Sequence, residues 1–235
     1  RTIDLCGETK ENCEYTYNHE TYDLTIKGTG EMNDYTETNP SPWSNHKASV
    51  IDTIAIETIT KIGNHAFNGC SKYTSISIPT SVASIGTNAF NNNDGLTTLL
   101  LYKNVTAVGK DAFSNIETMK TVEYQGTTDP CNNENAFVNV ETQTVKVPIE
   151  YSSTTMCGLI PMTYGECGSG CTWNYNHASK LLSINGGTMT DISTTDPKWQ
   201  AQMNQIEKVV ITTTNIGSNA FKGATSLTTI ELSTN

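Results

Sequence analysis

Apolar and polar residues alternate in short runs that recur along the chain at a constant interval. The first inward residues of four successive runs are each 23 residues apart: Ile76, Leu99, Val122 and Val145. Such alternation, with β-branched or apolar side chains on one face, is typical of a half-buried strand. Ile54 begins the series 22 residues before Ile76. The pattern therefore predicts one strand per repeat, stacked in a parallel sheet.

A second periodic motif lies between the strands. It consists of an apolar residue and glycine, two spacer residues and Ala-Phe, and its clear copies end at Phe67, Phe90, Phe113 and Phe221. A degraded copy ends at Phe137 and has Cys131-Asn132 in place of the apolar-glycine pair. Fixed periods of this length are typical of stacked units that cannot bury their apolar faces alone. Because a 23-residue period leaves room for about one helical turn, the sequence predicts a strand-rich α/β solenoid with short helical or 3₁₀ crossovers.

Three columns of the repeat have structural interpretations. The phenylalanines are expected to form the spine of the core. The glycines are expected to allow a turn conformation that a side chain would resist. The residue before Ala-Phe is polar in every copy and is predicted to bond loop backbone groups: His65, Asn88, Asp111, Asn135 and Asn219.

A longer duplication overlies the short repeat. Residues 13–32 (CEYTYNHETYDLTIKGTGEM) match residues 171–189 (CTWNYNHASKLLSINGGTM), with an offset of 158. Each copy has two alternating runs around a turn, which predicts a β-hairpin that caps the end of a solenoid. The predicted organisation is a cap over 1–50, repeats over 51–148, a linker over 149–164, a second cap over 165–205 and the start of a second array over 206–235.

Six of the seven cysteines occupy positions that predict disulfides. Two short-range pairs flank the entries of the two caps, and a third pair is 26 residues apart, close to one repeat; the predicted bonds are Cys6–Cys13, Cys167–Cys171 and Cys131–Cys157. Zinc is the alternative, but neither short spacing has a second pair nearby. Cys70 is expected to keep its thiol as a small buried hydrophobe. Disulfides indicate an oxidising environment, and so an extracellular or cell-surface location.

Charge and composition exclude several classes of partner. The net charge is −10 and no cluster of Lys and Arg is present, which argues against nucleic acid and anionic membrane surfaces. No apolar stretch of 18 residues occurs, so membrane insertion is not predicted. Asn104 begins an Asn-x-Thr sequon and is the candidate glycosylation site.

Motifs that carry catalysis are missing from the sequence. It contains no Gly-x-Ser-x-Gly, no His-Glu-x-x-His and no phosphate-binding glycine loop. Glu31, Asp34 and Glu37 lack the alternating ligand pattern of a calcium loop and are interpreted as a solvated acidic face. His19 and His177 are interpreted as hairpin-turn residues. The sequence therefore predicts no catalytic residues, metal ligands or cofactor, and a protein that is not an enzyme.

Residues 62–70 (IGNHAFNGC), followed by a strand that ends at Ile78-Pro79, closely resemble the BspA-like leucine-rich repeats. The cap also resembles the segment that precedes many such arrays. This resemblance implies a surface or secreted protein of a host-associated bacterium or a protist, with a role in adhesion to host matrix proteins or other cells. The sequence departs from the family pattern in the fourth repeat, which has lost Ile-Gly, and in a second array that stops soon after it begins.

The open side of the predicted sheet is the expected binding face for a protein partner, either a host matrix protein or another cell-surface protein. The candidate binding residues alternate with the inward strand positions: Ser77, Leu100, Tyr102, Glu123, Gln125 and Lys146. Leu100 and Tyr102 are the expected anchors, although Leu100 would equally fit beneath the adjoining loop. The alternative is self-association, in which the edge strand at 229–232 meets the first cap of another molecule and builds a filament or surface layer.

Overall fold

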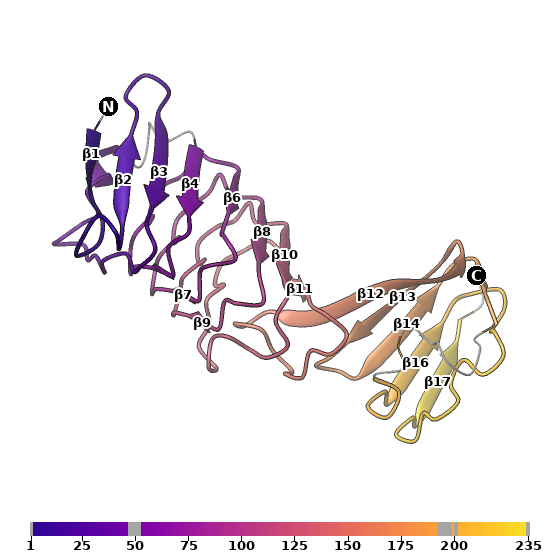
Figure 1. The fold of residues 1–235 in the computed structure, drawn as a ribbon. Coiled ribbons are helices and arrows are strands. Elements are labelled where there is room, and N and C mark those ends of the chain that lie inside the picture. The colour runs from indigo at the N-terminus through magenta and orange to yellow at the C-terminus, as the bar shows by residue number, and fades with distance from the viewer. Residues whose placement is uncertain (1, 47–52, 192–198, 200–201, 234–235) are drawn as a thin grey trace. The chain divides into compact units, whose positions relative to one another are not determined.

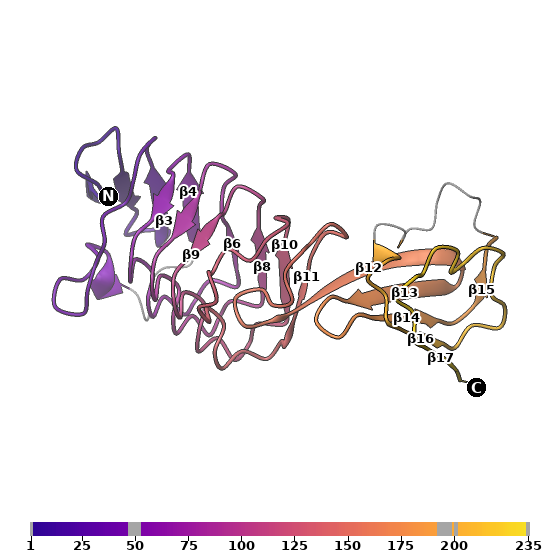
Figure 2. The same cartoon turned by 90° about the horizontal axis from the view of Figure 1, so that it is seen from below.

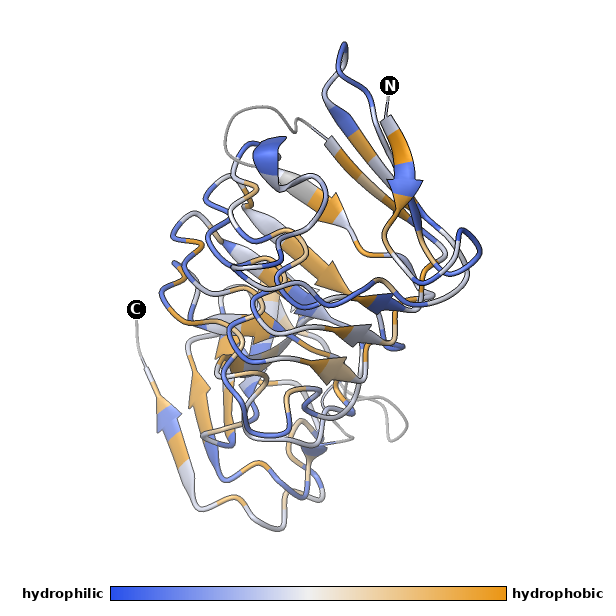
Figure 3. Ribbon diagram, turned by 90° about the vertical axis from the view of Figure 1, so that its left-hand side faces the viewer, coloured by the Kyte–Doolittle hydropathy of each residue, from blue (hydrophilic) through white to orange (hydrophobic). Residues whose placement is uncertain are grey.

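The computed structural model describes residues 2–46, 53–191, 199 and 202–233. The chain forms two compact units (Figure 1). Unit 1 comprises residues 1–145 and 156–159, and unit 2 comprises residues 146–155 and 160–235. Hydrophobic and hydrophilic residues alternate along the strands of both units (Figure 3).

Unit 1 begins with an antiparallel cap of three strands: β1 (Thr2–Leu5), β2 (Glu14–Tyr17) and β3 (Asp23–Lys27). Parallel strands follow in the order β4 (Thr53–Glu57), β6 (Ser75–Ser77), β8 (Thr98–Leu101) and β10 (Thr121–Tyr124), with β11 (Thr144–Lys146) next in the sheet. Ile76, Leu99 and Val122 lie in register, because each coil has the same length. The predicted parallel, strand-rich solenoid is confirmed, and Figure 2 shows its coils stacked one behind the next.

The Ile-Gly motifs build a second, smaller sheet of parallel strands: β5 (Lys61–Ile62), β7 (Ser84–Ile85) and β9 (Ala107–Val108). The Phe column forms a continuous ring stack with centroid distances of 5.1–5.2 Å: Phe67, Phe90, Phe113 and Phe137. Trp43 extends this stack by packing on Phe67 at 5.5 Å, and its Nε1 donates to the Ala66 carbonyl at 2.8 Å. One tryptophan thus closes the cap end of the core.

In the described coils of unit 1 the predicted helical crossovers do not form. Segments 63–74, 86–97 and 109–120 contain turns and no helix; η1 (Ser44–His46) precedes the repeats. Two residues per coil have positive φ, the one before Ala-Phe (Asn88, 54°) and the one two after Phe (Asn92, 59°), and this left-handed geometry interrupts a helix. Backbone donors bond the next coil instead, as in Phe90 N–H to Ala112 O at 2.7 Å. Hydrogen bonding between coils therefore replaces hydrogen bonding within a helix.

The glycine column also has a different cause from the one expected. Gly63, Gly86 and Gly109 lie outside the left-handed region, so the predicted need for an unusual turn conformation was wrong. A Cβ on Gly63 would lie 1.8 Å from the Asn33 carbonyl oxygen, and one on Gly86 would lie 2.5 Å from Asn64 N. Glycine is required because the preceding coil's backbone occupies the space of a side chain.

Unit 2 repeats the cap topology. The strands run in the order β12 (Ile160–Ser169), β13 (Cys171–Asn176), β14 (Leu181–Asn185), β16 (Lys208–Ile211) and β17 (Thr229–Leu232), with β15 (Thr188–Met189) paired to β12. The first three are antiparallel and the last two continue in parallel, as β1 to β4 do. Trp199 Nε1 donates to Ala220 O at 3.1 Å, which repeats the bond from Trp43 to Ala66. On β17, Ile230 and Leu232 are 51% and 68% exposed.

Disulfides predicted from the cysteine spacing are present: Cys6–Cys13, Cys131–Cys157 and Cys167–Cys171. Cys70 is buried and lies outside these three bonds. The Cys131–Cys157 bond joins the degraded fourth repeat to segment 156–159 of the same unit, where Ala136 N–H donates to Cys157 O at 3.1 Å. The disulfide thus secures the coil that has lost its Ile-Gly motif.

The segment predicted as a linker, 149–164, includes buried residues and the first half of β12. Tyr151, Met156 and Leu159 are 2% exposed or less. Residues 149–155 and 160–164 belong to unit 2, and residues 156–159 belong to unit 1. The other predicted domain bounds stay predictions.

Candidate functional site

The predicted binding residues of β6, β8 and β10 share one row on the outer face of the sheet. Ser77 is in register with Leu100, and Leu100 with Glu123. Ser77 is exposed, whereas Leu100 and Glu123 are half-buried. Neighbouring strands lie about 4.8 Å apart, so the three side chains form a continuous strip. Leu100 is its apolar centre.

The other three predicted residues lie at the margins of this strip. Tyr102 directly follows β8 and is half-buried, and Gln125 directly follows β10 and is exposed. The Gln125 N–H donates to Leu101 O at 2.9 Å, which continues the strand ladder for one more residue. Lys146 is exposed at the end of β11. The structure therefore unites Ser77, Leu100 and Glu123 by register and places Tyr102 and Gln125 one step beyond the strand ends.

A parallel row of threonines borders the strip and was not predicted as part of it. Thr98 is in register with Thr121, and both are exposed. Their 23-residue spacing, which continues to Thr144, was visible in the sequence. The row adds hydroxyl donors and acceptors beside Leu100. The face thus has an apolar centre with polar groups on both sides.

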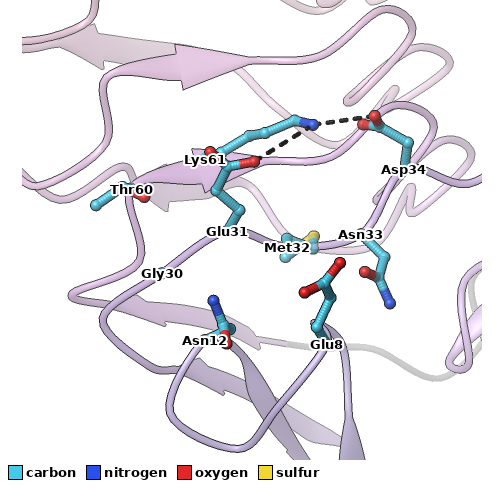
Figure 4. Close-up of a pocket in the computed structure, with 9 residues that line it drawn as sticks. All are labelled: Glu8, Asn12, Gly30, Glu31, Met32, Asn33, Asp34, Thr60 and Lys61. Carbon is cyan, nitrogen blue, oxygen red and sulfur yellow. Dashed lines mark hydrogen bonds and ion pairs between the residues drawn. The ribbon is translucent and has the colours of Figure 1, made fainter.

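A pocket of about 490 Å³ lies between the cap and the first repeat (Figure 4). Lys61 Nζ lies 2.9 Å from an Asp34 carboxylate oxygen and 3.9 Å from a Glu31 oxygen. Partial burial opposes ionisation of Asp34, but the Asn64 N–H and Lys61 outweigh it and lower the pKa of that carboxyl. Glu31 and Asp34 are thus engaged with a lysine, and Asp34 also with the backbone, and these contacts join the cap to the first repeat.

In the described parts of the chain, one group of three side chains has the proximity of metal ligands: Asp129, Cys131 and Cys157. The two sulfurs are bonded to each other. The Asp129 carboxylate accepts the N–H groups of Cys131 at 2.9 Å and Cys157 at 3.2 Å. This arrangement orders the loop around the disulfide.

Asn104, the candidate glycosylation site, is exposed, and its Nδ2 donates to Thr80 O at 2.7 Å. No helix in the described parts of the chain has the length and apolar character needed to cross a bilayer.

The family model for the "BspA type Leucine rich repeat region" matches residues 45–156 and 190–235 in six copies. The chain belongs to this family. No curated protein matches this BspA-type protein. A leucine-rich repeat protein from Eubacterium ventriosum is 18% identical, with 100% of this chain and 73% of that chain covered and a TM-score of 0.49. A leucine rich cell surface protein from Faecalibacterium prausnitzii is 15% identical, with 95% and 75% covered and a TM-score of 0.39. A leucine-rich repeat protein from Bacteroides ovatus is 15% identical, with 94% and 75% covered and a TM-score of 0.33.

His177 lies in the turn between β13 and β14, as expected, and it is buried in the cap of unit 2. Its Nε2 lies 2.8 Å from Thr163 Oγ1, and its ring meets Tyr175 and Tyr151 edge to face. Burial, assisted by the nearby charge of Lys180, lowers the pKa of His177 to about 4.

Unit 2 is therefore expected to lose stability as the pH falls from about 6.5 to about 4. In this range the unfolded chain binds a proton at His177 that the folded chain does not, so the loss reaches about 3 kcal/mol near pH 4 and then levels off. Hydrogen exchange of β13 and β14 at a series of pH values measures this loss of stability. The variant His177→Gln should remove this component, and an unchanged pH profile in that variant would contradict the assignment.

Proposed function

We propose that this protein is a non-catalytic, extracellular or cell-surface binding protein that captures a protein partner through the outer strand face of unit 1. The observation that carries the proposal is the row of Ser77, Leu100 and Glu123, held in register by the parallel sheet. Family membership supports it, because solenoids present extended surfaces built from repeated positions. The partner is a host matrix protein or a protein of another cell surface.

Recognition would depend on Leu100 and Tyr102. Apolar and aromatic side chains near the centre of an interface contribute most of the binding free energy, and polar neighbours exclude water around them. Ser77 and the threonines at 98 and 121 are small, exposed side chains near Leu100. Glu123 and Gln125 then supply polar contacts on the adjoining strand.

The cysteines support the proposed location. Three disulfides join six cysteines that are all buried. Such bonds persist in oxidising surroundings outside the cytosol. The proposal of an extracellular or cell-surface site rests on this chemistry.

Leu100→Asp and Tyr102→Ala are each expected to weaken partner capture at least about fivefold, because each removes an anchor contact worth about 1 kcal/mol or more. Binding to a panel of immobilised extracellular matrix proteins measures this. Lys110→Ala, an exposed change on the Ala-Phe side, is the control and should bind normally. Normal binding by both face variants together with loss in the control would place the site on the other side of the coil. The unfolding curves of the variants should match that of the unchanged protein, which would show that any loss of binding is not caused by a loss of folding.

A second candidate function is structural, as a unit that assembles head to tail. The observation that favours it is the exposure of Ile230 and Leu232 on β17, an outer strand of its sheet among the described residues. Exposed strand edges with apolar side chains pair readily with other chains. If the protein has this function, its molecular mass measured by light scattering should increase with protein concentration.

A further inference from the structure

The pocket between the first cap and the first repeat, which we name the cap pocket, has walls fixed by the backbone. Three segments form these walls (Figure 4): residues 8–12, 30–34 and 60–61. The Gly30 N–H donates to Asn12 O at 3.0 Å, and the Thr60 N–H donates to Gly30 O at 2.8 Å. The Asn33 N–H donates to Cys6 O at 2.7 Å, next to the Cys6–Cys13 disulfide. Because the walls are held by main-chain hydrogen bonds, a ligand would enter a pocket that is already formed.

The cap of unit 2 joins its first repeat through the same framework. A parallel bridge and a carboxylate that accepts a backbone N–H at 2.8–2.9 Å occur in both units: Glu31 to Lys61 and Asp34 to Asn64 in unit 1, and Thr188 to Asn215 and Asp191 to Ser218 in unit 2. Met32 and its counterpart Met189 are both buried at this junction. The duplicated cap of unit 2 therefore shows what the junction needs in order to fold.

The lining of the cap pocket differs between the units, although the framework is the same. The two cysteines of the cap are 7 residues apart in unit 1 and 4 residues apart in unit 2, and Glu8 lies in the longer loop. In unit 2 a threonine and an asparagine have the positions of Glu31 and Lys61. A cap thus folds without these three charged side chains, so the structural role of the cap does not account for them.

The cap pocket is negatively charged. Three acidic residues and one lysine line it, which gives a net charge of −2: Glu8, Glu31, Asp34 and Lys61. Lys61 Nζ lies 2.9 Å from the Asp34 carboxylate but 3.9 Å from that of Glu31, whose side chain is 69% exposed. Among the described residues no ion pair involves Glu8, because Lys10 of the same loop pairs with Glu14. Asp34 thus neutralises the lysine, and the carboxylates of Glu8 and Glu31 can accept hydrogen bonds from a cation.

Neutral groups complete the lining of the pocket. Glu8 and Asn12 extend from their loop toward the segment that carries Glu31 and Asn33 (Figure 4). Met32 adds an apolar surface between them. A guanidinium group is planar, always charged and carries five N–H donors, and it bonds carboxylates in pairs. Acceptors on two facing walls and an apolar surface for the side-chain stem therefore match arginine better than the compact ammonium group of lysine.

We propose that the cap pocket binds an arginine side chain of a partner polypeptide. Glu8 and Glu31 supply the charged acceptors, and the amides of Asn12 and Asn33 supply the neutral hydrogen bonds. The volume of about 490 Å³ is within the range of ligand pockets and leaves room for backbone atoms beside the arginine. This site is separate from the strand face, and its existence does not depend on that face binding anything.

The test uses the full chain and a blocked tripeptide, acetyl-Ala-Arg-Ala-amide. In NMR spectra the amide signals of Gly30, Asn33 and Thr60 should shift in a saturable manner, with a Kd of about 1 mM or lower. A peptide with citrulline in place of arginine keeps the shape of the side chain without its charge. It should bind about tenfold more weakly, because hydrogen bonds between charged groups are the stronger ones.

Variants of the lining identify the residues that recognise the arginine. Glu8→Gln and Glu31→Gln should each weaken binding about threefold, and the double variant about tenfold, because exposed ion pairs contribute little singly and separate pairs add. Lys61→Gln should strengthen binding about twofold, because it removes the positive charge that repels the ligand. An increase in affinity cannot result from damage to the pocket, so this variant also controls for folding.

Glu11→Gln is the matched control, because Glu11 is exposed on the same loop and does not line the pocket. It changes the net charge by the same amount and should leave the affinity unchanged. Equal weakening by Glu11→Gln and Glu8→Gln would mean that the peptide responds only to the overall charge, and would overturn the proposal. Equal binding of the citrulline peptide, or weaker binding in Lys61→Gln, would overturn it as well. If free arginine binds as tightly as the tripeptide, the ligand is the amino acid, and the assignment to a polypeptide is wrong.

Discussion

Replacing Phe90 with alanine is expected to lower the free energy of unfolding of unit 1 by about 4 kcal/mol, within the range for large aromatic-to-alanine changes in cores. The Phe90 ring is fully buried and lies 5.1 Å from Phe67 and 5.2 Å from Phe113. Its neighbours are held by hydrogen bonds between coils, so the cavity cannot collapse. Hydrogen exchange of the peptides that contain β7 and β8 measures the loss, with β13 and β14 of unit 2 as the internal reference.

Phe221→Ala is the matched control for this prediction. Phe221 occupies the same motif position in unit 2 but is only half-buried, packed at the margin of that unit's core. Replacing Phe221 should lower the free energy of unfolding by less than half as much as replacing Phe90, because it removes less buried apolar area. Equal costs at the two positions would mean that the ring stack of unit 1 adds nothing beyond the motif itself.

Loss of the Cys131–Cys157 disulfide is expected to lower the stability of unit 1 by about 3.5 kcal/mol in the double variant Cys131→Ala/Cys157→Ala. The bond joins cysteines separated by 26 residues, and the chain-entropy relation for a loop of this length yields that value. It also holds segment 156–159 against the coil that has lost Ile-Gly. Urea unfolding monitored by hydrogen exchange of β10 measures the effect.

The disulfide of the first cap serves as the comparison. Cys6 and Cys13 are separated by only 7 residues. The double variant Cys6→Ala/Cys13→Ala should therefore lose about 1 kcal/mol less stability than the Cys131→Ala/Cys157→Ala variant. If the short loop costs more than the long one, strand geometry in the cap, and not loop entropy, dominates the contribution of these bonds.

Local periodicity in the sequence was sufficient to predict the strands, the ring stack and the duplicated caps. Ile76, Leu99 and Val122 alternate with polar neighbours at a fixed spacing, and a residue's position in a strand fixes the face on which its side chain lies. The Phe column follows in the same way, because equal coil lengths bring equal positions into register. The two cap disulfides could be predicted from the repetition of a short-range cysteine pair, and Cys131–Cys157 from a spacing close to one repeat.

Contacts between residues distant in sequence decided the remaining features. The turns around Ala-Phe replace the predicted helices because their backbone donors find acceptors on the next coil, as Phe90 finds Ala112. Gly63 is required by the Asn33 carbonyl of the preceding coil. His19 and His177 occupy matching positions in nearly matching sequences, yet one is exposed and the other buried, because Tyr151 packs on only one of them. Periodicity within a repeat contains no information on such contacts, so the tertiary structure alone determined them.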